Sequence, residues 1–240
     1  MSANPMKPIP IHCKTCSTRG KSVFCDLSSD HLQEIDTAKT TNDYRPHQVI
    51  FYEGNQPYGL YCINSGKVKI YKMDADGHQQ IVRLAGPGDI MGYRCLLAGQ
   101  PYTATAETLE EAHVCFVDKK TFFHVLETHP ATAFHVMTLL AGDLGKAEQQ
   151  ITNIVHKNIR ERLAELLLVF KSKYGEKGKT GIKLNINLTR EELAELIGTT
   201  QESVIRLISE FKQDKLIAVA GREITLIDLP KIIQTANLAD

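Results

Sequence analysis

Hydrophobic and polar residues alternate in short runs between about residues 48 and 118. In the run "KVKIYKM" this alternation predicts a half-buried strand, with Val68 and Ile70 facing the core and Lys67 and Lys69 facing solvent. Turn sequences such as "NSG", "DADG" and "GPG" separate the run from its neighbours. Several short strands joined by glycine-rich turns predict a small antiparallel β-roll or sandwich.

The hydrophobic period becomes helical between about residues 130 and 156. Apolar residues recur there at alternating steps of three and four, which is the pattern of a helix that pairs with a second helix. A helix that packs only on the β-roll is the alternative, but so regular a seam favours a parallel helix pair between two copies of the chain. The expected interface residues are Met137, Leu140, Leu144, Ala147, Ile151 and Ile154.

Residues 188–217 predict two helices joined by a tight turn. Thr189 and Glu192 have the spacing of a capping box, which begins the first helix. Gly198 can take the positive φ angle that the turn requires, and one of the two threonines after it can cap the second helix. The second helix has an apolar face made of Val204, Leu207, Ile208 and Phe211.

A β-hairpin is predicted after these helices, because "LIAVAGREITLID" has two apolar runs on either side of a glycine-containing turn. Two short helices followed by a hairpin make a winged helix-turn-helix, and two ordinary packed helices are the alternative. Ahead of the helices, "KSKYGEKGKTG" at residues 171–181 predicts a surface loop.

The outward positions at the start of the second helix indicate DNA recognition, since in a helix-turn-helix they lie against base edges in the major groove. Arg206 can donate two hydrogen bonds to guanine, and Glu202 can accept one from cytosine. A surface ion pair between these two residues, four positions apart, is also compatible with the pattern. The expected base contacts are Gln201, Glu202, Ile205 and Arg206, and the expected phosphate contacts are Arg190, Thr199, Thr200 and Ser203.

Composition narrows the class of protein. The chain has 240 residues, a formal net charge of +0 and a pI near 7.1, which argues against a polybasic protein that coats nucleic acid non-specifically. It has no apolar run long enough to cross a membrane and no apolar core of a secretory signal, so we expect a cytoplasmic protein. It has no Ser/His/Asp set, P-loop or GxGxxG motif, so we do not expect an enzyme.

The order of β-roll, long helix and winged helix-turn-helix resembles the Crp/Fnr superfamily of bacterial transcription regulators. The segments "TREELAELIGTTQESVIRLISEF" and "AGPGDIMGYRCLLAG" carry the most specific similarity. The resemblance implies an α+β fold in four parts: a cysteine-bearing segment (1–28), a cyclic-nucleotide-binding-like β-roll (29–128), a dimerisation helix (129–157) and a winged helix-turn-helix domain (158–240). It also implies a homodimer that binds palindromic double-stranded DNA and contacts RNA polymerase.

Within that family, Glu202 and Arg206 occupy the positions of an E-x-x-x-R motif that contacts bases. The Fnr branch usually has serine just before this arginine, whereas this chain has Ile205, which suits contact with a thymine methyl group. The resemblance therefore does not fix the DNA half-site.

The resemblance does not extend to a cyclic AMP site. Cyclic-nucleotide binders of the superfamily have Gly-Glu in the phosphate-binding turn and an Arg-Ser or Arg-Thr pair downstream. Here the turn is Gly92-Tyr93, and residues 99–107, "GQPYTATAE", contain no arginine. A buried phosphate without a cation would be unpaired in a medium of low dielectric constant, so we do not expect cyclic AMP to bind.

Three of the six cysteines lie within "HCKTCSTRGKSVFC", residues 12–25. Cys13 and Cys16 have a common chelating spacing, and in a reducing compartment such a group indicates a metal site or a redox pair. Zinc bound by Cys13, Cys16, Cys25 and either His12 or Cys115 is one alternative. A thiol switch of Cys13 and Cys16, or no chemistry, are the others.

Similarity to the Fnr-type oxygen sensors favours an iron–sulfur site. Those proteins hold a [4Fe-4S] cluster with three N-terminal cysteines and one distant cysteine on a strand of the roll. The residues here that resemble them are Cys13, Cys16, Cys25 and Cys115, and four thiolates match the usual ligand count. The eight residues between Cys16 and Cys25 are more than the best-known members have.

Two further groups of residues have plainer interpretations. Cys62 and Cys95 are interpreted as small buried hydrophobic residues. The alternative function is a regulator that binds a small molecule in the β-roll and in which the N-terminal cysteines are inert. Haem is one such ligand because of His124, His129 and His135, although spaced histidines near the start of a helix usually face solvent.

Overall fold

The computed structural model describes residues 12–178 and 180–237. The first eleven residues of the predicted cysteine-bearing segment, residue 179 of the predicted loop and the last three residues of the predicted DNA-binding domain lie outside the described part. The chain divides into two compact units between Leu144 and Gly145.

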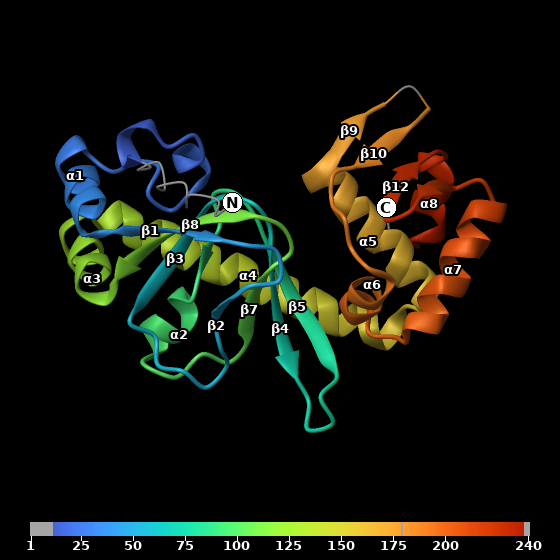
Figure 1. The fold of residues 1–240 in the computed structure, drawn as a ribbon, viewed down its shortest axis with the longest axis horizontal. Helices are drawn as coiled ribbons and strands as arrows, with labels where there is room; N and C mark the ends of the chain where they lie inside the picture. Colours follow the sequence, from blue (N-terminus) through green and yellow to red (C-terminus); the bar gives the residue numbers. More distant parts are fainter. Residues whose placement is uncertain (1–11, 179, 238–240) are drawn as a thin grey trace, which may run out of the picture. The chain divides into compact units, whose positions relative to one another are not determined.

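Two four-stranded antiparallel sheets form the β-roll of the N-terminal unit (Figure 1). The strand order is β1-β8-β3-β6 in one sheet and β2-β7-β4-β5 in the other. Their fully buried side chains include Leu60, Ile63, Val68 and Val114, and the predicted β-roll is confirmed. The strands are β1 (Thr40–Tyr44), β2 (Val49–Phe51), β3 (Gly59–Ser65), β4 (Val68–Met73), β5 (Gln79–Ala85), β6 (Ile90–Met91), β7 (Thr105–Thr108) and β8 (Ala112–Asp118).

Helices accompany the β-roll, and the cysteine-bearing segment packs among them. That segment contacts α1, and α1 contacts α3 (Figure 1). Phe24 and Leu27 of this segment are buried in the core of the unit. Their burial anchors the segment to the rest of the unit. The helices are η1 (Cys13–Thr15), η2 (Arg19–Lys21), α1 (Ser29–Ala38), α2 (Tyr93–Ala98), α3 (Lys119–Thr128) and the predicted long helix α4 (Pro130–His156). Among the described helices, none is long and apolar enough to cross a membrane.

Lys69 is buried, contrary to the alternation predicted for its strand. It lies directly opposite Glu107 across the β4–β7 pair, and its Nζ is 3.8 Å from Glu107 Oε1. Lys69 Nζ also donates a hydrogen bond to Gln79 Oε1 at 3.3 Å. A lysine can be buried when its ammonium is paired. The alternation of apolar and charged residues therefore did not predict that Lys69 is buried.

The C-terminal unit contains the predicted winged helix-turn-helix. Its sheet has the strand order β11-β12-β10-β9, and β11 and β12 form the hairpin that was expected after the second helix. The elements are α5 (Ile159–Tyr174), β9 (Gly175–Lys177), β10 (Ile182–Leu184), α6 (Arg190–Ile197), α7 (Gln201–Gln213), β11 (Ile217–Ala220), β12 (Glu223–Leu226) and α8 (Leu229–Thr235).

The prediction of a surface loop at residues 171–181 is wrong for most of that segment. Helix α5 begins at a capping box of Asn158 and Glu161 and continues to Tyr174. The next residues form the antiparallel pair of β9 and β10. Strand β10 also pairs with β12, so a partner distant in sequence orders a segment whose own composition is that of a loop.

Candidate DNA-binding helix and thiol cavity

The helix-turn-helix forms as its local signals predict. The Thr189 backbone N–H donates to Glu192 Oε2 at 2.8 Å, and the Glu192 backbone N–H donates to Thr189 Oγ1 at 3.0 Å. Gly198 has a φ of 67° and ends α6, and Thr200 caps α7. The apolar face predicted for the second helix is buried. The opposite face of α7 is therefore the one that can contact another molecule.

The four predicted base-contacting residues lie on that exposed face of α7. Ile205 is 48% exposed, and 67% of the Arg206 side chain is exposed. Arg206 Nε lies 4.0 Å from Glu210 Oε1, whereas no ion pair joins Arg206 to Glu202 in the part of the chain described here. The expected alternative of a Glu202–Arg206 pair is thus not formed. An exposed guanidinium with only a long contact to a carboxylate can still reach a base edge.

The predicted phosphate-contacting residues have structural partners as well. Thr200 Oγ1 accepts a hydrogen bond from the Ser203 backbone N–H at 3.3 Å, so both residues belong to the cap of α7. The Thr199 backbone N–H donates to the Ala194 carbonyl. Arg190 Nη2 donates to the carbonyl of Gly221 at 3.1 Å, in the turn of the wing. Arg190 therefore joins α6 to the wing.

Four cysteines line one cavity of about 50 Å³ in the N-terminal unit. Two come from the ends of η1, and the other two come from β3 and β8. Cys62 and Cys115 are register partners across the β3–β8 pair. Phe24, Leu32, Ile35 and Lys39 are among the other lining residues. The thiols of this cavity, called the thiol cavity below, belong to Cys13, Cys16, Cys62 and Cys115.

The thiols of the cavity differ in acidity. Burial raises the pKa of Cys13 to about 12 and also raises the pKa values of Cys62 and Cys115. Burial also acts to raise the pKa of Cys16, but its hydrogen bonds outweigh this effect and the pKa is lowered. Thr18 Oγ1 lies 3.2 Å from Cys16 Sγ, and Asn64 Nδ2 donates to the same sulfur at 3.4 Å. Cys16 is therefore the cavity thiol that most readily becomes a thiolate.

Asp36 on α1 holds the start of the cysteine-bearing segment. Its Oδ1 accepts a hydrogen bond from the Cys13 backbone N–H at 2.8 Å and pairs with Lys39 Nζ at 2.6 Å. Its Oδ2 lies 2.9 Å from His12 Nδ1. His12, one of the zinc ligands considered above, is thus directed to a carboxylate rather than to the cavity.

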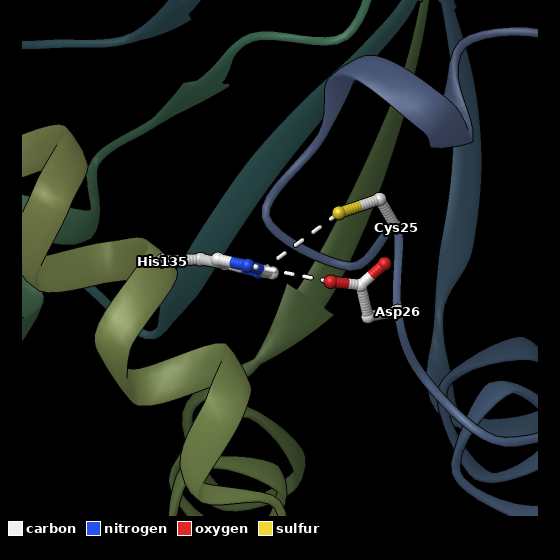
Figure 2. A group of neighbouring side chains, drawn as sticks. All are labelled: Cys25, Asp26 and His135. Atoms are coloured by element: carbon white, nitrogen blue, oxygen red, sulfur yellow. Dashed lines mark hydrogen bonds and ion pairs between the residues drawn. The ribbon is translucent and has the colours of Figure 1, made fainter.

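Cys25 lies apart from the thiol cavity, beside His135 of α4 (Figure 2). Cys25 Sγ is 3.9 Å from His135 Nδ1, and Asp26 Oδ2 is 3.4 Å from His135 Nε2. The neighbouring residue Phe24 is buried and lines the cavity, so the backbone at this point directs Phe24 rather than Cys25 toward it. The structure therefore brings together Cys13, Cys16 and Cys115 of the predicted set, but not Cys25.

Cys62 is the cavity thiol that sequence reasoning missed. A single cysteine in an apolar strand has no local feature that separates a ligand from a core residue. The signal lies in the pairing of β3 with β8, which sets Cys62 opposite Cys115.

No three thiols of the cavity are gathered as closely as the ligands of a single metal ion among the residues that the structure describes. In residues 12–178 and 180–237, the groups whose three ligand atoms lie within 4.8 Å of one another are Cys25/Asp26/His135 and Asp74/Asp76/His78, both outside the cavity. Tetrahedral zinc has Zn–S bonds of about 2.3 Å, so its sulfur ligands must lie within this 4.8 Å limit of one another. A cubane cluster separates its ligands further, because each thiolate binds a different iron. The all-thiol donor set of the cavity fits such a cluster.

The three histidines considered for haem are not gathered at one site. His124 Nε2 lies 3.6 Å from Glu34 Oε1, and His129 Nδ1 lies 2.9 Å from Thr132 Oγ1. His135 faces Asp26 and Cys25. These separate partners give no support to a haem site.

Helix α4 carries an exposed apolar stripe. Met137, Leu144, Ile151 and Ile154 are 51%, 62%, 64% and 53% exposed in the single chain. Leu140 is half-buried and Ala147 is exposed, so all six predicted interface residues have surface in reach of a partner. Large apolar side chains aligned along one helix mark a surface suited to association.

Two family models match the two units of the chain. Residues 41–129 match the cyclic nucleotide-binding domain, and residues 161–234 match the Crp-like helix-turn-helix domain. The two matches together span more than half of the 240 residues.

Relatives with known names align along nearly the whole chain. The fumarate and nitrate reduction regulatory protein of Vibrio cholerae is 24% identical over 230 residues, which cover 95% of this chain and 92% of that protein. The anaerobic regulatory protein of Haemophilus influenzae is 26% identical over 225 residues, which cover 93% of this chain and 87% of that protein.

Solved structures share the fold. FixK2 of Bradyrhizobium japonicum superposes with a TM-score of 0.75 at 24% identity, covering 84% of this chain and 99% of that one. A CRP-family transcriptional regulator of Thermus thermophilus superposes with a TM-score of 0.71 at 25% identity, covering 82% of this chain and 97% of that one. Such proteins are regulators and not enzymes. With its β-roll followed by a helix-turn-helix, the chain belongs to the Crp/Fnr family of DNA-binding transcription regulators.

Proposed function

We propose that this regulator is a homodimer whose DNA binding responds to oxygen or redox state through a [4Fe-4S] cluster bound at the thiol cavity. The gathering of four cysteines around one cavity carries the proposal. The names of the relatives, which refer to fumarate and nitrate reduction and to anaerobic regulation, support the same kind of signal.

The surroundings of the cysteines support this proposal. Cys13, Cys16 and Cys115 are ligands by family resemblance, and all three line the cavity. Hydrogen bonds from Thr18 and Asn64 favour the thiolate of Cys16, which is the form that binds metal. When bound, a cluster supplies a redox-active centre whose potential depends on its solvent exposure and hydrogen bonds.

The apolar stripe of α4 is the proposed dimer interface. Pairing two such stripes removes the exposed side chains of both copies from water, which is the main driving force of association. A two-fold dimer sets two α7 helices on half-sites one helical turn apart, which matches palindromic DNA. Contact with RNA polymerase is part of the proposal and is supported by family membership alone.

Cyclic AMP is not the proposed signal, although the roll matches the cyclic nucleotide-binding domain. Tyr102 lies against Gly92, so that a Cβ atom added to this glycine would be 3.1 Å from Tyr102 Cε1. The Tyr102 ring also stacks on Phe51, with ring centroids 4.0 Å apart. Aromatic side chains thus stand beside the turn where a nucleotide phosphate would need an arginine.

The test is purification without oxygen, followed by measurement of iron, acid-labile sulfide and the visible spectrum. We expect about four irons and four sulfides per chain and an absorption that bleaches in air. DNA duplexes selected from a random pool by the anaerobic protein should bind roughly 5- to 150-fold more weakly after exposure to air.

The Arg206→Ala variant is the matched control, because it should keep the cluster while its sequence preference is weakened. A colourless wild-type protein without iron or sulfide, even after anaerobic reconstitution with ferrous iron and sulfide, would overturn the cluster. Zinc or thiol oxidation at the cysteines would then be the alternative signal.

A further inference from the structure

We propose that Cys62, and not Cys25, is the fourth thiol ligand at the cavity, so that the cluster joins the N-terminal segment to two neighbouring strands of the roll. This inference rests on the proposed function. It differs from the ligand set that family resemblance implies, in which Cys25 takes the fourth place.

The pairing of strands β3 and β8 places Cys62 at the site. Cys62 is opposite Cys115 in the antiparallel register, so both side chains lie on the same face of the sheet. Directly opposed residues have Cβ atoms about 4.5–5.5 Å apart. Cys13 packs against the same core as Cys62, and both line the cavity with Cys16. Cys62 thus lines the same cavity as the other three thiols.

Cys25 lies in other surroundings. Its sulfur lies beside His135 Nδ1, and the residues on either side of the Cys25–Asp26 pair, Phe24 and Leu27, are buried in the core. Phe24, the residue before Cys25, lines the cavity wall, whereas Cys25 does not. The loop between Cys16 and Cys25 is long enough for Cys25 to turn toward the cavity, but the core packing of Phe24 opposes it.

A lysine and its carboxylate partner lie beside the thiols of the cavity. Lys39 lines the cavity, and only 7% of its side chain is exposed. Its ammonium pairs with Asp36 and would offset part of the negative charge of bound thiolates at Cys13, Cys62 and Cys115, whereas burial acts against the free thiolates.

The experiment compares two matched variants of the full chain, Cys62→Ser and Cys25→Ser, after anaerobic reconstitution with ferrous iron and sulfide. Bound iron, sulfide and the visible spectrum are measured for each. Cys25→Ser should retain the wild-type content. Loss of a residue that only supports a metal ligand already lowers metal affinity by roughly tenfold. Cys62→Ser removes a ligand itself, so we expect cluster binding to weaken by at least this factor. The inference is overturned if Cys25→Ser loses the cluster or if Cys62→Ser retains it.

Two further variants guard against a loss caused by misfolding. Cys62→Ala, whose fold is checked by circular dichroism, should lose the cluster as Cys62→Ser does. The double variant Cys25→Ser with Cys95→Ala retains just the four cavity cysteines and should still bind about four irons. If this double variant is folded but binds no cluster, the inference is overturned. A wild-type chain that binds no cluster removes the proposed function itself, whereas a cluster that needs Cys25 removes only this inference.

Discussion

The hydroxyl of Tyr93, the first residue of helix α2, donates a hydrogen bond to Asp143 Oδ2 at 2.5 Å, which ties α2 to helix α4. Arg83 Nη1 lies 3.1 Å from the same oxygen, and the Tyr93 ring is fully buried. Tyr93 follows Gly92, at the position where a cyclic-nucleotide site of this family has glutamate. The chain therefore uses this turn to contact the helix that carries the apolar stripe.

Removing that hydroxyl should destabilise the N-terminal unit. In Tyr93→Phe the carboxylate of Asp143 loses a charge-assisted hydrogen bond, and we expect the free energy of unfolding to fall by about 1–3 kcal/mol. Urea denaturation followed by circular dichroism measures this change. The control is Tyr58→Phe, because Tyr58 is 77% exposed and should change stability by less than about 0.5 kcal/mol. Equal losses in the two variants would contradict the assignment.

A charge within the stripe of α4 should separate the dimer. Ile151→Glu places a carboxylate where burial of an isoleucine contributes roughly 1.5–3 kcal/mol per chain, so the dimer should dissociate at least about tenfold more readily. Sedimentation over a range of concentrations measures the dissociation constant. Thr152→Glu adds the same charge one position away, off the seam, and should leave the dimer intact. If both variants remain equally dimeric, the stripe is not the interface.

Loss of Arg206 should relax DNA specificity. In Arg206→Ala we expect discrimination between selected and scrambled duplexes to fall by about 1–3 kcal/mol, since a bidentate contact to guanine is lost. Lys212→Ala removes the same charge from the last turn of α7 and should affect both duplexes alike. Titration with labelled duplexes at one fixed salt concentration gives the two affinities. Specificity that survives Arg206→Ala would show that another element selects the bases.

The thiols of the cluster-free protein should react in an order set by their acidity. The thiolate is the reactive form of a cysteine. Because the pKa of Cys16 is lowered and that of Cys13 is raised, Cys16 has the larger thiolate fraction at neutral pH. With iodoacetamide near pH 7 we expect Cys16 to be alkylated before Cys13, as peptide mass spectrometry would show. Asn64→Ala removes a hydrogen bond to Cys16 and should move its half-modification to higher pH. No shift in that variant would argue against the role of Asn64.

Local signals determined the elements that bind DNA. The capping box of Thr189 and Glu192, the glycine turn at Gly198 and the apolar face of α7 each depend on residues a few positions apart. Their interactions form within one helix or turn, so the sequence alone located them. The long helix α4 followed from its hydrophobic period for the same reason.

Tertiary structure decided which cysteines meet. Cys62 and Cys115 are distant in sequence and become neighbours because β3 pairs with β8 in one register. A slip of one residue would turn Cys62 to the other face of the sheet, and no pattern within either strand reports that choice. Cys25 is close to Cys16 in sequence yet lies outside the cavity, because the core holds Phe24 there instead. The sequence by itself determined that this chain carries a helix-turn-helix and a cysteine motif, whereas strand register and core packing decided which thiols share a site.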